Sequence, residues 1–332
     1  MTEKENYMRI VRGDMPEWLP LESYLYTPEG MTPPVTTVRP SALGMTKDFR
    51  DIFGVKFVGT DSTGDMMLPE PGNFILKDIH DWPDVIKVPN LDDINFEEMA
   101  RKDMEKIDRS QTAVCLGTHV GYFQYLMEFM GFSEGLLTMA MYQDEVYELF
   151  EYMAKFYDEF TKRAVDAYRP DILNLADDIA SAQSTFMSLN MYRELIKPFQ
   201  VRLAQPANDV GIPINMHCCG KCEEFIEDWF DFNVCMWNPP QAMNDLLGIK
   251  AKYGRKLVLN GCSSPDDPYN FSWATEEEVR VCIRKKVDNY APNGGYIFRA
   301  NVLGPKSDET VGIRREWIID EYLKYGRNCY SK

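Results

Sequence analysis

Apolar stretches long enough to cross a membrane are absent from this sequence of 332 residues. The first residues, Met1 to Asn6, are polar, so the apolar core of a signal peptide is missing as well. From these two absences we expect a cytoplasmic protein without membrane association. Because cytoplasmic thiols stay reduced, a cluster of cysteines in such a protein indicates metal binding or thiol chemistry more than disulfides.

An excess of positive charge is also missing. The chain has 36 Lys and Arg against 52 Asp and Glu, a formal net charge of −16, which excludes the usual nucleic-acid-binding classes. The sequence has no fixed-period repeat and no low-complexity tract. No predicted strand is followed by a glycine fingerprint for dinucleotides or phosphates, which counts against the common nucleotide-binding folds.

What the sequence does contain is a regular alternation of strand-like and helical segments. Predicted strands cover 55–59, 112–117, 170–176, 211–217, 234–237, 256–261 and 295–300. Predicted helices cover 95–104, 122–130, 143–168, 190–210, 222–230, 243–253, 276–290 and 314–325. This alternation predicts a parallel sheet, and its length fits a (β/α)8 TIM barrel, with a doubly wound open sheet as the alternative.

The first 50 residues are rich in proline and turn-forming residues. We therefore expect 1–50 to be an irregular N-terminal arm that packs on the barrel, and 51–332 to be a single catalytic barrel domain.

Polar side chains follow several of the predicted strands. They are Asp177 and Asp178, His217 and Cys219, Cys262, and Arg299 and Asn301. Barrel enzymes build their active sites at the carboxyl ends of the strands, so we expect these residues to share one face. The acidic pair could bind substrate, act as a general acid or base, or cap a helix.

Residues 215–222, Asn-Met-His-Cys-Cys-Gly-Lys-Cys, hold three of the eight cysteines and one of the three histidines. Side chains alternate along a strand, so Asn215, His217 and Cys219 can share one face. Thiolate sulfur and imidazole nitrogen are ligands that zinc prefers. A redox pair, Cys219 with Cys222, and plain packing residues are the alternatives.

Four segments in this order, 174–179, 188–199, 216–220 and 238–241, are similar to the uroporphyrinogen decarboxylase superfamily. The shared features are an acidic pair, a helix ending in proline and a His-x-Cys-Gly strand end. The resemblance spans roughly residues 50–325 and implies a (β/α)8 barrel.

Two branches of that superfamily differ from this chain. The decarboxylases carry an arginine-rich N-terminal motif, which is missing here, and bind a polycarboxylate, which a charge of −16 suits poorly. The thiol-directed, corrinoid-linked methyltransferases carry His-x-Cys and a distant third cysteine. His217 and Cys219 match the first part, but 299–303 contains no cysteine.

A further branch, the ether-cleaving methyltransferase I, has a zinc motif with 27 residues between an acidic residue and a cysteine, and 39 before a second cysteine. This spacing falls on Glu194, Cys222 and Cys262, with Glu194 where the family has Asp. The resemblance therefore implies these three residues as zinc ligands, and His217, Cys219 and Asp178 stay open as substitutes.

The same resemblance implies a zinc-dependent methyltransferase that demethylates phenyl methyl ethers of the guaiacol, vanillate or veratrol type. The methyl group would pass to the Co(I) corrinoid (cobalamin) of a partner protein, which requires an open barrel mouth with an apolar rim. Three zinc ligands and an open fourth position suit this role, and we expect Asp178 and His217 to be catalytic. The two other branches are the alternative functions, and the sequence leaves a homodimer open.

Overall fold

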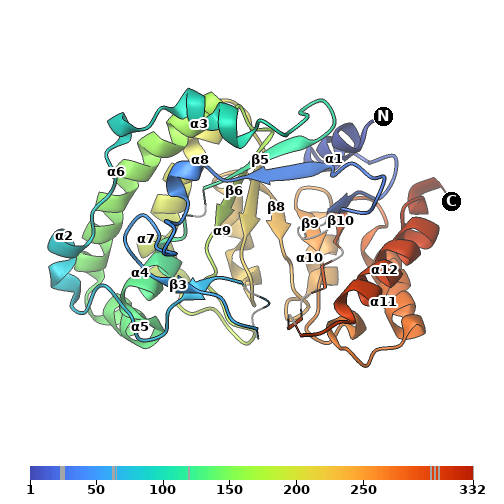
Figure 1. Ribbon diagram of the computed structural model, residues 1–332. Coiled ribbons are helices and arrows are strands. Elements are labelled where there is room, and N and C mark those ends of the chain that lie inside the picture. The colour runs from blue at the N-terminus through green and yellow to red at the C-terminus, as the bar shows by residue number, and fades with distance from the viewer. Residues whose placement is uncertain are drawn as a thin grey trace.

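The computed structural model describes all residues except 23–26, 62, 63, 65, 119, 300, 303, 306 and 332. Eight parallel strands form one sheet in the order β1-β10-β9-β8-β7-β6-β5-β2. Their bounds are β1 Leu21–Glu22, β2 Val35–Val38, β5 Ala113–Gly117, β6 Ile172–Ala176, β7 Ile214–His217, β8 Val234–Asn238, β9 Val258–Gly261 and β10 Tyr296–Arg299. With helices between the strands, this is the predicted (β/α)8 barrel (Figure 1).

The α-helices pack outside the strands, apart from α1. They are α1 Glu3–Val11, α2 Trp82–Val85, α3 Phe96–Asp103, α4 Tyr122–Met130, α5 Phe132–Met141, α6 Gln143–Tyr168, α7 Leu189–Leu195, α8 Lys197–Asp209, α9 Ile226–Phe230, α10 Leu246–Tyr253, α11 Glu276–Tyr290 and α12 Val311–Glu321. The long helix α6 matches the predicted range and buries the apolar residues that recur at helical spacing.

The helical stretch predicted over 190–210, with a kink or restart expected at Pro198 and Pro206, is divided in the structure. Pro198 occupies the first turn of α8, where its missing N–H costs nothing, and α7 ends just before it. Pro206 lies inside α8 without ending it. The first proline therefore restarts the helix and the second is tolerated within it.

Two barrel strands come from residues 1–50, the segment expected as an irregular arm. β1 pairs with β10, and β2 pairs with β5. The predicted strand 55–59 is present as β3, Phe57–Val58, but it pairs antiparallel with β4, Leu68–Pro69, outside the barrel sheet. Short strands inside proline-rich sequence carry almost no period-2 signal, so tertiary pairing decides these elements.

The amino-terminal end of the barrel is closed by α1. Its buried residues Tyr7, Met8, Ile10 and Val11 form one apolar cluster with inward-facing strand residues. Figure 1 shows α1 at this end and β3 at the opposite end. The polar residues that follow the strands therefore lie at the carboxyl end, which α1 leaves open.

A search of the described helices finds none that is both long and apolar enough to cross a membrane.

Candidate functional site

Three side chains meet at the carboxyl end of the barrel: Asp178 after β6, His217 at the end of β7, and Cys219 two residues later. We call them the Asp–His–Cys group. Their ligand atoms all lie within 4.8 Å of one another, and each side chain is half-buried. Within the described part of the chain, no other group of His, Cys, Asp and Glu side chains comes together in this way.

The geometry of this group fits a zinc ion. The Cys219 Sγ lies 3.9 Å from His217 Nε2, which lies 3.9 Å from Asp178 Oδ1. Tetrahedral zinc, with bonds of about 2.3 Å to sulfur and about 2.0 Å to nitrogen, needs about 3.5 Å between S and N. Small side-chain movements would close the difference. A thiolate, an imidazole and a carboxylate leave a fourth position for substrate.

The imidazole of His217 is oriented by a neighbour on β8. His217 Nδ1 lies 3.2 Å from the Asn238 Oδ1, to which Arg299 also donates. Because an amide oxygen only accepts, Nδ1 carries the proton and the lone pair on Nε2 faces Cys219 and Asp178. Burial lowers the pKa of His217, as do Arg299 and Arg39, while Asp178 raises it. The ring is therefore neutral, as metal binding requires.

Asn238→Ala is expected to weaken metal binding about 10- to 100-fold, because the imidazole loses the partner that fixes its tautomer. Competition with a zinc chelator measures this affinity. Asn270→Ala, which removes an amide bonded only to the carbonyls of Ser264 and Pro265, is the matched control. Equal affinities in the two variants would contradict the positioning role of Asn238.

The loop that carries Cys219 requires glycine at position 220. Gly220 has φ +91°, and a Cβ there would lie 2.5 Å from the backbone oxygen of Ala180. Its N–H donates to Gln241 Oε1 at 2.6 Å, and its carbonyl accepts from Asn244 Nδ2 at 2.9 Å. The segment after β8 thus holds the loop in place.

These supporting residues were missed as functional residues. The only sequence signal was the segment 238–241, Asn-Pro-Pro-Gln, which contributes Asn238 and Gln241. Nothing in the sequence pointed to Asn244.

The implied zinc ligands Glu194, Cys222 and Cys262 do not come together as a ligand group. Glu194 is exposed on the outer helix α7. The Cys222 thiol is buried and donates to the carbonyl oxygens of Cys218 and Gly220, both at 3.6 Å. The three residues that match the family spacing are therefore not close together in space. The alternatives that the sequence left open, Asp178, His217 and Cys219, are the residues that meet.

The backbone conformation at the end of β9 keeps Cys262 out of the Asp–His–Cys group. Gly261 has φ +125° and Cys262 has φ +53°, so the alternation of side chains ends with β9. The thiol is buried near Lys286 of α11, and burial raises its pKa to about 12. Cys262 is therefore an inert thiol of the helix layer.

The acidic pair has two different roles. Asp177 is buried and accepts from the backbone N–H of Phe123 and Gln124, both at 3.1 Å, which caps α4. Burial raises its pKa to about 7. Asp178 faces the site and accepts from the Cys219 N–H at 2.7 Å. His119, which follows the predicted strand 112–117 in the sequence, lies outside the described residues.

At neutral pH, the Glu128 carboxyl group on α4 is protonated in the folded protein, whereas the same group would be ionised in the unfolded chain. Burial, followed by Asp51 and Asp177, raises its pKa from 4.5 to about 8. A raised folded-state pKa means that the free energy of unfolding falls as the pH rises from 4.5 to about 8.

Glu128→Gln should therefore raise the melting temperature at pH 8.5, by an amount that reflects a few kcal/mol, and change it little at pH 4. Glu98→Gln is the control. Arg101 and Lys102 lower the pKa of Glu98, so removing the Glu98 carboxylate should not raise the melting temperature. An equal gain at both pH values would contradict the assignment.

Comparisons with known proteins bear on the fold and family. The sequence model of the uroporphyrinogen decarboxylase (URO-D) family matches residues 72–301, more than half of the chain. A methyltransferase from Methanosarcina mazei has a similar structure, with a TM-score of 0.63 and 13% identity over 98% of this chain and 99% of that chain. No curated protein sequence matches this chain.

Proposed function

Because this chain belongs to the uroporphyrinogen decarboxylase family, we propose that it is a methyltransferase of that fold, dependent on zinc. It takes the methyl group of a phenyl methyl ether and passes it to the Co(I) corrinoid of a partner protein. The observation that carries this proposal is the Asp–His–Cys group at the open end of the barrel. The fold shared with the M. mazei methyltransferase supports it.

Zinc held by the Asp–His–Cys group would act as a Lewis acid on the ether oxygen, since phenolate is a poor leaving group. The protein supplies the orientation. Asn238 fixes the His217 ring, and the N–H of Cys219 fixes one oxygen of Asp178. We propose that the other Asp178 oxygen exchanges a proton with a ring hydroxyl of the substrate. Burial and Asp178 raise the pKa of Cys219, so metal binding is expected to release a proton.

Several loops that follow barrel strands expose apolar side chains, which supports the proposal of a corrinoid partner. After β9, Trp273 is 77% exposed and stacks on Phe271 with ring centroids 4.8 Å apart. After β2, Phe49 and Met45 are also exposed, and so are Met66 and Leu68. Exposed apolar side chains that gather on one face of a protein are typical of a contact surface.

Trp273→Ala should raise the KM for the corrinoid protein about tenfold with little change in metal content, because a large exposed aromatic acts as an anchor. Steady-state kinetics with varied corrinoid protein measures this. Val210→Ala, which removes an exposed apolar side chain after α8 at the other end of the barrel, is the control. A KM that stays constant in Trp273→Ala would remove this surface from the docking model.

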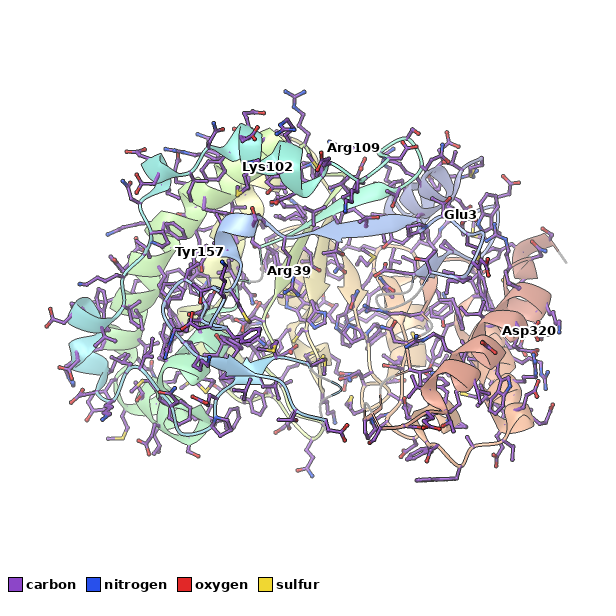
Figure 2. The ribbon with its side chains drawn as sticks, in the orientation of Figure 1. Glu3, Arg39, Lys102, Arg109, Tyr157 and Asp320 are labelled. Carbon is purple, nitrogen blue, oxygen red and sulfur yellow. The ribbon has the colours of Figure 1, made fainter. Side chains whose placement is uncertain are left out.

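A decarboxylase is the second candidate, favoured by the charges of two arginines near His217. Arg299 is the last residue of β10, and Arg39 follows β2 and lies near the middle of the view in Figure 2. Guanidinium groups bind carboxylates well. The thiol-directed branch has less support, since Asp178 and not a third cysteine completes the group.

One assay separates these functions. Protein is mixed with Co(I) corrinoid protein and guaiacol, vanillate or veratrol, and methyl-cobalt formation is followed in the visible spectrum. A parallel reaction with uroporphyrinogen measures CO2 release. Absence of methyl-cobalt with every ether would overturn the proposal, and full activity in metal-free protein would overturn the role of zinc.

A further inference from the structure

A cavity lies at the opposite end of the barrel from the Asp–His–Cys group. Its volume is about 660 Å³, within the range of small-molecule sites. It is lined where α1 ends and where β7, β8 and β9 begin, by residues that include Arg12, Asn208, Asn233, Arg255 and Lys256. No element of the proposed reaction uses it.

This cavity is lined by positive charge, whereas the protein as a whole is negatively charged. Among the residues that the structure describes, three cations line it and no Asp or Glu does, in a chain with a net charge of −16. The structure pairs many basic side chains with acids, yet Arg12, Arg255 and Lys256 take part in no ion pair in the described part of the chain. All three side chains are exposed, and Lys256 also lowers the pKa of Glu227. An anion bound between the three cations would relieve part of their mutual repulsion.

Helix ends account for the position of these cations but not for their free donors. α1 ends at Val11 and α10 ends at Tyr253, and cations are favourable after helix C-termini. Neither the Arg12 nor the Arg255 side chain donates a hydrogen bond to any described residue, including the terminal carbonyls. Both guanidinium groups are exposed, so their N–H groups are open to solvent and to a ligand.

Two amides add neutral donors to the same cavity. Asn233 Nδ2 donates to Asn208 Oδ1 at 3.1 Å, and Asn208 Nδ2 donates to the Phe232 carbonyl at 3.4 Å. Each amide nitrogen has two N–H groups, so each keeps one. Lys256 is held over the Phe230 ring at 3.7 Å, which fixes its ammonium group.

We propose that this cavity binds a small molecule with two or more adjoining oxyanion groups, phosphate or carboxylate. Arginine forks bind such groups in a bidentate way, and the amides and Lys256 supply the remaining donors. The volume exceeds what a single inorganic phosphate fills. The site lies at the end that α1 closes, so its ligand does not compete with the methyl donor.

Binding is tested by calorimetry and thermal shift with sodium pyrophosphate, ATP and citrate, at constant ionic strength set with sodium chloride. We expect saturable stabilisation by at least one of the three, with a Kd at least about tenfold weaker in the Arg12→Gln/Arg255→Gln double variant. Preference for pyrophosphate and ATP assigns phosphate, and preference for citrate assigns carboxylate.

The matched control is Lys155→Gln/Lys162→Gln, which removes two exposed charges from α6, away from the cavity. It should bind like the unaltered protein. Absence of saturable binding by all three anions, or equal affinity in the arginine double variant, would overturn the proposal. Methyl transfer is measured separately, so the fate of this site is independent of the proposed function.

Discussion

Cys219→Ser is expected to lower the zinc content from about one ion per chain to less than about a tenth, since a serine hydroxyl is a poor zinc ligand. Methyl transfer should fall by on the order of 10³-fold, because Lewis-acid assistance is worth several kcal/mol. Elemental analysis and the visible-spectrum assay measure the two effects. Circular dichroism should stay the same, since the Cys219 side chain is at the half-exposed mouth and not in the core.

The control for this prediction uses the two cysteines implied by the family spacing. Cys222→Ser and Cys262→Ser change the same atom, but their thiols lie outside the Asp–His–Cys group. Both variants should keep their zinc, with some loss of stability from burying a hydroxyl. If Cys222→Ser and Cys262→Ser lose zinc while Cys219→Ser keeps it, the zinc ligands are those implied by the family spacing, Glu194, Cys222 and Cys262.

Gly220→Ala is expected to lower the free energy of unfolding by about 2–5 kcal/mol and to empty the metal site. A left-handed backbone costs a non-glycine residue about 1–2 kcal/mol, and the new Cβ at 2.5 Å from the Ala180 oxygen adds the cost of moving backbone. Since the displaced loop carries Cys219, the ligand moves with it. Thermal unfolding and elemental analysis report the two consequences.

Gly211→Ala separates conformational strain from steric contact. Gly211 has φ +70°, but a Cβ there meets nothing within 4 Å, and it lies at the opposite end of the barrel. It should cost only about 1–2 kcal/mol and leave zinc content unchanged. If the two glycine variants lose stability equally, the contact with Ala180 has no role in shaping the site.

Much of the fold is a local property of the chain. The helical spacing of apolar residues predicts α6 at its observed bounds, and the alternation of segments predicts the barrel. The strands β1 and β2 were not predicted, because strands of two and four residues in proline-rich sequence depend on their partners β10 and β5.

The site divides in a similar way. The order of strands and the period of two along each strand placed Asp178, His217 and Cys219 at one end of the barrel, and this part follows from sequence alone. Asp178 was expected to be catalytic, but the reason why it, and not Asp177, turns toward the site lies in the packing. Asp177 accepts hydrogen bonds from the N–H groups of α4, which reach it only once the helix has packed against the strands. Asp178 therefore faces the site, where it accepts from Cys219.

The sequence by itself determined the barrel, the family and the end of the barrel that carries the chemistry, because these depend on periodicity and on the order of motifs. Only the tertiary structure decided which of the candidate ligands lie close together. Glu194, Cys222 and Cys262 match the family spacing along the chain. That spacing does not determine where each side chain lies in space. The positive φ at Cys262 turns its thiol toward the helix layer, whereas the extended strand and the tight turn at Gly220 bring Cys219 to His217 and Asp178.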